Sequence, residues 1–146
     1  MRRLILLLTA VALVGCGGSS KNTTLYTGGD WKVVLDGNHA TAFHQIAGTW
    51  KPDTSGAVKI RILAPEGNVA PTPQVAAELS AKRPLIESGM WVDGQELLVK
   101  GGGLTSTKGT IYGAPATPLT KGTHVAVAYA RTDQHATAVA WSFRVV

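Results

Sequence analysis

Two histidines lie close together in the first third of the chain and suggest a metal site. His39 and His44 flank Phe43, and the carboxylates of Asp36 and Asp53 lie a few residues to either side. Imidazole nitrogens and carboxylate oxygens are good ligands for copper and zinc. An odd separation, however, places two side chains on opposite faces of a regular strand. A metal site at His39 and His44 is therefore the weakest of our functional hypotheses.

The tryptophans suggest a second chemistry, because carbohydrate-binding β-sandwiches present flat aromatic rings to the faces of sugars. Trp141 alternates with Phe143 and is expected in the core. Trp31, Trp50 and Trp91 remain candidates for ligand binding if their rings are exposed. The competing expectation is that they too fill the space between sheets, as tryptophans on strands usually do.

Catalysis has little support in the sequence. A covalent mechanism needs a nucleophile beside a base and an orienting group, and we find neither a nucleophile elbow nor an ordered triad. The run Gly101-Gly102-Gly103 lacks the Lys-Ser/Thr pair of a phosphate-binding loop. We therefore expect no enzyme, no catalytic residue and no cofactor.

Alternating hydrophobicity predicts an all-β body that would have to position any such site. Residues 58–62 place three β-branched side chains on one face and two cations on the other, and residues 31–35 alternate likewise. Asp36-Gly37 and Asp93-Gly94 are typical hairpin turns. Residues 72–79 combine a helix-start pattern with alternation, and we favour a strand there.

The C-terminal region predicts two long antiparallel strands. Val125, Val127 and Tyr129 share one face, and residues 139–145 alternate in the same way. The turn is expected at residues 133–135. His135 then belongs to that turn and His124 to the start of the preceding strand.

The first residues are typical of an exported protein. Two arginines precede an apolar run over residues 4–15, which is too short for a permanent membrane helix and predicts a signal peptide over residues 1–15. The run ends in Leu13-Val14-Gly15-Cys16, which resembles the lipobox of bacterial lipoproteins. That resemblance implies cleavage after Gly15, a diacylglycerol thioether on Cys16 and an acylated amino terminus.

The lipoprotein resemblance implies a location and a first partner, the membrane itself. Two or more acyl chains on Cys16 form a nearly permanent anchor, since each buried methylene contributes about 0.8 kcal/mol. Gly17 favours outer-membrane sorting if the envelope is Gram-negative. We expect the cell membrane or the outer membrane, with the protein facing the extracytoplasmic side, and a flexible tether over residues 16–27 because of its Gly, Ser, Thr and Asn content.

Charge and cysteine content limit the remaining possibilities. The chain carries 14 basic and 9 acidic residues, and loss of Arg2 and Arg3 with the leader lowers the net charge from +5 to +3. Basic residues do not cluster with aromatic ones, so nucleic acid is not an expected partner. Cys16 is the only cysteine, so no internal disulfide can stabilise the fold.

The C-terminal half resembles the bacterial immunoglobulin-like modules of exported proteins. The matching segments are Val92-Asp93-Gly94 and residues 118–127, 130–133 and 141–145. The resemblance implies an antiparallel β-sandwich over residues 71–146, preceded by an N-terminal β segment over residues 28–70. One continuous domain over residues 28–146 is the alternative.

Together these patterns predict a non-catalytic, lipid-anchored cell-envelope protein. Its immunoglobulin-like module is expected to bind another envelope protein or to serve a structural role. Binding of a carbohydrate or cell-wall glycan through exposed tryptophans is the alternative, and metal binding is the third hypothesis.

Overall fold

The computed structural model describes residues 22–101 and 106–146. Within that part of the chain there are twelve strands and no helix, so the all-β prediction is confirmed. The described residues contain no helix long and apolar enough to cross a membrane. The expected signal peptide and Cys16 lie outside the described residues.

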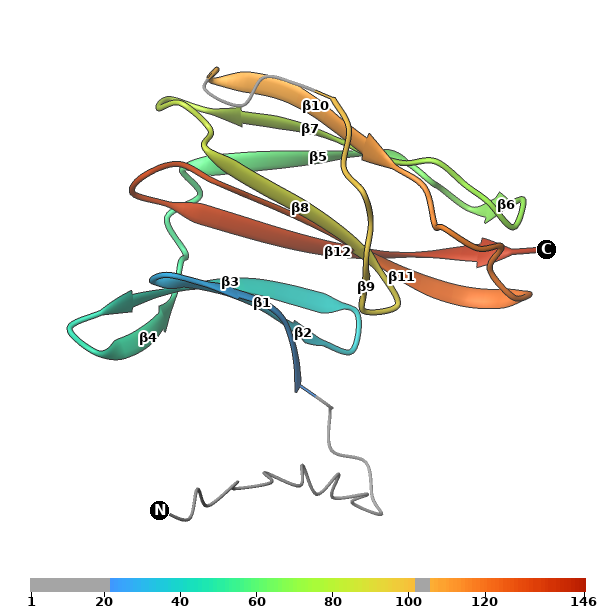
Figure 1. Cartoon of the computed structure of the whole chain (residues 1–146), viewed down its shortest axis with the longest axis horizontal. Coiled ribbons are helices and arrows are strands. Elements are labelled where there is room, and N and C mark those ends of the chain that lie inside the picture. Colours follow the sequence, from blue (N-terminus) through green and yellow to red (C-terminus); the bar gives the residue numbers. More distant parts are fainter. Residues whose placement is uncertain (1–21, 102–105) are drawn as a thin grey trace, which may run out of the picture.

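Three sheets form three layers, and all their strand pairs are antiparallel except β6 with β12 (Figure 1). The first sheet is a meander of β1 (Asn22–Gly28), β2 (Trp31–Asp36), β3 (His39–Ile46) and β4 (Thr49–Pro52). The second has the order β10 (Lys108–Gly113), β7 (Val75–Ala81), β5 (Val58–Ala64). The third, in the middle of the molecule, has the order β6 (Asn68–Val69), β12 (Ala136–Val145), β11 (Gly122–Arg131), β8 (Glu87–Val92), β9 (Gln95–Glu96).

The second and third sheets form the expected β-sandwich. Their facing side chains make one buried cluster that includes Leu79, Met90, Ile111 and Phe143. The strand order is immunoglobulin-like, with one sheet ending in β5 and the other carrying the long β11–β12 hairpin. β5 and β6 precede residue 71 yet pair with β7 and β12, so the division expected at residue 70 does not coincide with a break between sheets.

The middle sheet is buried on both faces. Met90 and Ala128 point into the sandwich, while Trp91, Val127 and Tyr129 point the other way and form a second cluster with the first sheet. Residues 125–130 of β11 are accordingly a nearly continuous apolar run, which is what a strand covered on both sides requires. The first sheet is therefore a cover for the outer face of an immunoglobulin-like sandwich.

The tether predicted over residues 16–27 is too long, because its second half is β1. Residues 22–28 pair with β2 from Asn22↔Asp36 to Gly28↔Trp31, with a shift of register between Thr24 and Tyr26. The polar composition of this segment indicated a tether, but Thr23, Thr24 and Tyr26 favour strand conformation, and half-buried Leu25 and Tyr26 pack against the second cluster.

The predicted turns are confirmed. Asp93 and Gly94 have φ 49° and 81°, so the β8–β9 hairpin uses the left-handed conformations that an Asp-Gly pair favours. At the β2–β3 hairpin Asp36 is the last strand residue, and Gly37 has the positive φ, 61°. Residues 75–81 form strand β7, which confirms the strand preferred over a helix. Val75, Ala77 and Leu79 are buried along it.

Candidate functional site

The two histidines of the metal hypothesis lie toward opposite ends of β3 and have different surroundings. His44 is half-buried and stacks on Trp31, with ring centroids 3.8 Å apart and planes 2° apart. His39 is exposed at the other end of β3, opposite Asp36 across the turn. Among residues 22–101 and 106–146, no three His, Cys, Asp or Glu side chains are grouped so that they could hold a metal ion.

The tryptophans do not form an aromatic platform, which corrects the ligand-binding role considered for them. Trp31 and Trp91 are only 5% and 3% exposed, because both fill the second cluster between the first and middle sheets. Trp50 is half-buried, with the Lys32 ammonium 4.7 Å from its ring centroid. Trp141 packs against the sandwich core as predicted, and its indole nitrogen donates to the Pro65 carbonyl at 3.1 Å.

His124 has a role that its place at the start of a strand did not indicate. Its ring is buried, and its Nδ1 lies 2.5 Å from Asp93 Oδ2 while its Nε2 lies 2.6 Å from the Thr120 carbonyl. Both neighbours offer acceptor oxygens, so this arrangement favours the imidazolium form, in which both ring nitrogens carry hydrogens. The hydrogen bonds to Asp93 and Thr120 raise the pKa of His124. The contacts of His124 with Thr120 and Asp93 connect the loop before β11 to the β8–β9 turn.

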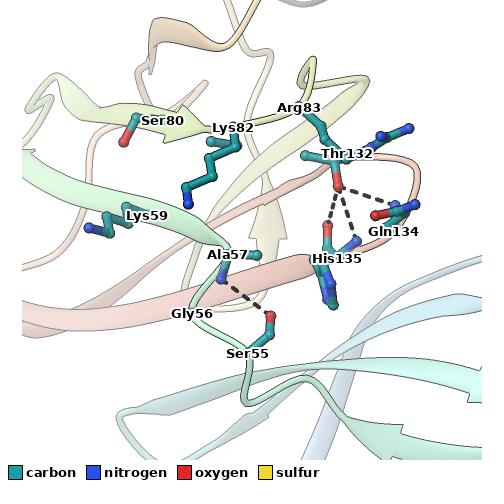
Figure 2. Close-up of a pocket in the computed structure, with 11 residues that line it drawn as sticks. Ser55, Gly56, Ala57, Lys59, Ser80, Lys82, Arg83, Thr132, Gln134 and His135 are labelled. Carbon is teal, nitrogen blue, oxygen red and sulfur yellow. Dashed lines mark hydrogen bonds between the residues drawn. The ribbon is translucent and has the colours of Figure 1, made fainter.

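A groove opens at one end of the sandwich, where the loops gather (Figure 2). Its volume is about 640 Å³. It is lined by residues 55–57 of the β4–β5 connection, Lys59 on β5, residues 80–83 at the end of β7, and Thr132, Gln134 and His135 of the β11–β12 hairpin. We call it the loop-end groove. In immunoglobulin variable domains, the loops that correspond to β7–β8 and β11–β12 carry the binding site.

Asp53 holds one side of the loop-end groove in place. Its Oδ1 accepts hydrogen bonds from the Ser55 amide at 2.9 Å and the Ser55 hydroxyl at 2.6 Å. Its Oδ2 accepts from the Ala136 amide at 2.9 Å and lies 3.2 Å from His135 Nδ1. Burial alone would raise the pKa of Asp53, but the hydrogen bonds from Ser55, Ala136 and His135 outweigh it and hold this pKa below its ordinary value.

The hairpin that forms the opposite side has a turn built on Thr132. Its buried hydroxyl accepts from the amides of Gln134 and His135 at 3.2 and 3.1 Å. This side-chain turn lies at residues 132–135, where the turn was expected, and it needs no residue with positive φ. Figure 2 shows the three hydrogen bonds of Thr132, including the one to the His135 carbonyl.

Arg83 ties the β7–β8 loop to this hairpin. Its Nε and Nη2 donate to the two carboxylate oxygens of Asp133 at 2.7 and 2.5 Å. The hydrogen bonds lower the pKa of Asp133 and raise that of Arg83. The guanidinium fork is therefore already occupied, and both charges of this pair are matched.

Lys59 and Lys82 give the groove its unbalanced positive charge. In the described part of the chain neither ammonium makes an ion pair with a carboxylate, whereas Asp53 and Asp133 are already engaged. Figure 2 shows the Lys82 side chain extending from the end of β7 toward β5, which carries Lys59. A ligand in the groove therefore meets two ammonium groups that form no ion pair with any described residue.

The site contains Ser, His and Asp side chains, but not in a nucleophilic order. The Ser55 hydroxyl donates to the Asp53 carboxylate, and His135 contacts the other oxygen of that carboxylate. In a triad the imidazole lies between the acid and the hydroxyl and removes its proton. Here the carboxylate lies in the middle, so the three residues brace the loop.

A second, shallower hollow of about 490 Å³ lies beside the β9 and β10 strands. It is bordered by Leu98, 79% exposed, and by Tyr112, 38% exposed. Glu96 and Lys100 both border it, so its charges balance.

Comparison with protein-family models and with curated proteins found no match. An assignment of function therefore has to rest on the sequence and the geometry of this chain.

Sequence analysis did not identify the loop-end groove. One signal was present: Lys82-Arg83 is the only adjacent pair of basic residues after Arg3, and Pro84 follows it. That pattern is typical of a basic loop. The contacts that build the groove, between Asp53 and His135 and between Arg83 and Asp133, join residues 82 and 50 positions apart, which spacing in the sequence cannot reveal.

Proposed function

We propose that this protein is a non-catalytic binding protein of the bacterial cell envelope, anchored by lipid on Cys16, that binds a partner protein through the loop-end groove. The observation that carries the proposal is the groove itself, formed where three loops meet at one end of an immunoglobulin-like sandwich and carrying the unmatched charges of Lys59 and Lys82.

The anchor is supported by the sequence at the start of the chain. The apolar run over residues 4–15 and the lipobox-like Leu13-Val14-Gly15-Cys16 are the basis for it. The described body begins at Asn22, six residues after Cys16. Such a short connection would keep the body close to the bilayer.

Rigid positioning supports binding at the groove. Its walls are fixed by Asp53, Thr132 and the Arg83–Asp133 pair, so little ordering of loops is needed when a partner binds. Glycan binding is not proposed as a second function, because two of the three tryptophans considered for it are buried.

The anchor is tested by expressing the full chain with its leader in a bacterial host and determining the mass of the N-terminal peptide. We expect a diacylglyceryl cysteine at Cys16, recovered in the membrane fraction. The Cys16→Ser variant should lose both the lipid and the membrane association. A mature peptide that begins elsewhere, or that carries no lipid, would refute the anchor.

Binding is tested by placing a photoreactive amino acid at Gln134, an exposed residue of the groove, or at Thr49, an exposed residue at the start of β4. Irradiation of cells that make the full chain should give a discrete protein adduct from Gln134 and none from Thr49. Equal labelling from both positions, or none from either, would contradict a binding face at the groove.

A further inference from the structure

We infer that the loop-end groove binds an extended, acidic segment of a partner polypeptide, with carboxylates of that segment paired to Lys59 and Lys82. This inference rests on the proposed function, because it names the partner chemistry for the same site. Three observations carry it: the charge of the groove, the size of the side chains along its floor, and the edge strand beside it.

The charge of the groove is complementary to carboxylates. The acidic residues nearest to it are satisfied internally, Asp53 by four hydrogen bonds and Asp133 by the fork of Arg83. Lys59 and Lys82 have no such partner among the described residues. Opposite charge supplied by a partner would steer its approach and set its register in the groove.

Five of the eleven residues that line the groove are small, and we refer to these five as its floor. Residues 55–57 are Ser, Gly and Ala, and residues 80–81 are Ser and Ala. Such a floor lets the backbone of a ligand approach closely, which suits an extended polypeptide. Ser55 is fixed by Asp53, so the floor is already ordered before binding.

β5 adds a backbone surface at the same place. It is the terminal strand of its sheet, with β7 as its only pairing partner within the described chain. An edge strand offers amide and carbonyl groups to an extended chain, a recurring mode of peptide recognition. The Val58 carbonyl is already taken by the Thr137 hydroxyl at 2.7 Å, so pairing would begin beyond Val58, where Lys59 lies.

The lining disfavours sugars and phosphate polymers. None of the described residues that line the groove is Trp, Tyr or Phe, so no ring is available to stack on a sugar. Arginine forks are the preferred recognition element for phosphate, and the fork of Arg83 is occupied by Asp133. Isolated lysines above a floor of small residues therefore fit a carboxylate-bearing peptide best.

The test is a fluorescence-anisotropy titration of the full-length lipidated chain in detergent micelles. The probe is a labelled peptide of alternating Glu and Thr, about twelve residues long and about 40 Å when extended. Matched probes are the same peptide with Gln in place of Glu, and inorganic polyphosphate as a competitor. The variants are Lys59→Gln with Lys82→Gln, and the control pair Lys51→Gln with Lys121→Gln, exposed lysines away from the groove with the same change in charge.

We expect the Glu peptide to bind and the Gln peptide not to bind. The Lys59→Gln/Lys82→Gln variant should weaken binding about five- to twentyfold, since each exposed ion pair is worth up to about 1 kcal/mol, and the control pair less than about twofold. Equal weakening by both pairs would show attraction to net charge alone and overturn the inference. The inference is also overturned if the Glu peptide does not bind, or if the Gln peptide binds equally well. It is overturned, too, if polyphosphate displaces the Glu peptide at a concentration of negative charge lower than that of the peptide.

Cross-linking from Gln134 separates failure of this inference from failure of the proposed function. If the Glu peptide does not bind but the Gln134 adduct persists in the Lys59→Gln/Lys82→Gln variant, the groove binds a partner of another chemistry and only this inference fails. If neither the peptide nor an adduct is found, both fail. If the wild-type chain binds the peptide and gives the adduct, and the Lys59→Gln/Lys82→Gln variant gives no adduct, this inference and the proposed function are both supported.

Discussion

Single residues at the two ends of the sandwich fix its loops through charged hydrogen bonds. At one end, the imidazolium of His124 bridges Asp93 and the Thr120 carbonyl, and it also lies against the ring of Phe143 at a centroid distance of 5.7 Å. Sequence analysis placed His124 at the start of a strand, which is correct, but gave it no role. Its acceptors are 31 and 4 residues away, and only the fold brings Asp93 to it.

Replacing His124 by Ala should destabilise the protein by about 1–3 kcal/mol below pH 6.5, because the Asp93 carboxylate and the Thr120 carbonyl lose the donor that the buried ring supplies. The pKa of His124 is raised in the fold. Its charge therefore stabilises the native state fully below the unfolded histidine pKa of about 6.5, and this stabilisation is lost as pH rises through the folded pKa. Urea unfolding of wild type and variant at about pH 6 and about pH 9 should show a smaller difference at the higher pH.

The control for this prediction is His39→Ala, an exposed histidine at the start of β3. We expect its effect on the free energy of unfolding to stay within about 0.5 kcal/mol at both pH values. A His124→Ala difference that is constant or grows with pH would show that the ring is neutral in the fold.

At the scale of elements, the middle sheet explains which predictions succeeded. Alternation identified β5 and β7 correctly, because each has one face in the core and one toward polar surroundings. It identified β12 through the large side chains at residues 139–145, although Ala138 and Ala140 on the other face of β12 pack against the first sheet. β11 alternates only weakly, because the first sheet covers its second face. The tether prediction failed at β1 for a related reason: composition says little about a polar edge strand whose pairing with β2 fixes it.

Gly89 lies at a crowded point of the middle sheet, beside Trp91 of the second cluster. A Cβ added to Gly89 would lie 2.7 Å from the far edge of the Trp91 indole, which is on the same face of β8 and buried. The Gly89→Ala substitution should therefore overpack the second cluster and lower the free energy of unfolding by about 1–3 kcal/mol.

Chemical denaturation monitored by tryptophan fluorescence measures this effect. The matched control is Ser88→Ala on the neighbouring position of β8, whose effect should stay within about 0.5 kcal/mol. A Gly89→Ala variant as stable as wild type would mean that Trp91 can move aside and that the cluster is loosely packed.

At the scale of the whole molecule, the first sheet is joined to the sandwich by one apolar cluster and a few polar contacts. Arg131 lies over the ring of Trp31 at 5.5 Å and donates to Glu87 at 3.3 Å. Burial would raise the pKa of Glu87, but its hydrogen bonds, including those from Arg131 and Tyr129, lower it. Asp53 continues this connection, because it follows β4 directly and accepts the amide of Ala136 in β12.

Replacing Asp53 by Asn should destabilise the protein by about 1–3 kcal/mol at pH 7, because an amide nitrogen would then face the donors of either Ser55 or Ala136. The pKa of Asp53 is lowered in the fold. Its contribution is therefore fully present above the unfolded pKa of about 3.9 and is lost as pH falls through the lower folded pKa.

Urea unfolding at about pH 7 and about pH 3 tests this prediction, with Asp30→Ala in the β1–β2 turn as the control. The difference between wild type and Asp53→Asn should shrink at the lower pH, while Asp30→Ala should stay close to wild type at both. A difference that is equal at the two pH values would mean that the charge of Asp53 does not stabilise the fold.

The central claim is that the loop-end groove is the binding face of the protein. The most direct test is to titrate the isotope-labelled full-length chain with the alternating Glu-Thr peptide and to map the changes in amide chemical shift. We expect the largest changes in amide chemical shift at Lys59, Ser80, Lys82 and Gln134. These changes should vanish in the Lys59→Gln/Lys82→Gln variant. Shifts centred on Leu98 and Tyr112, or spread evenly over the surface, would contradict it.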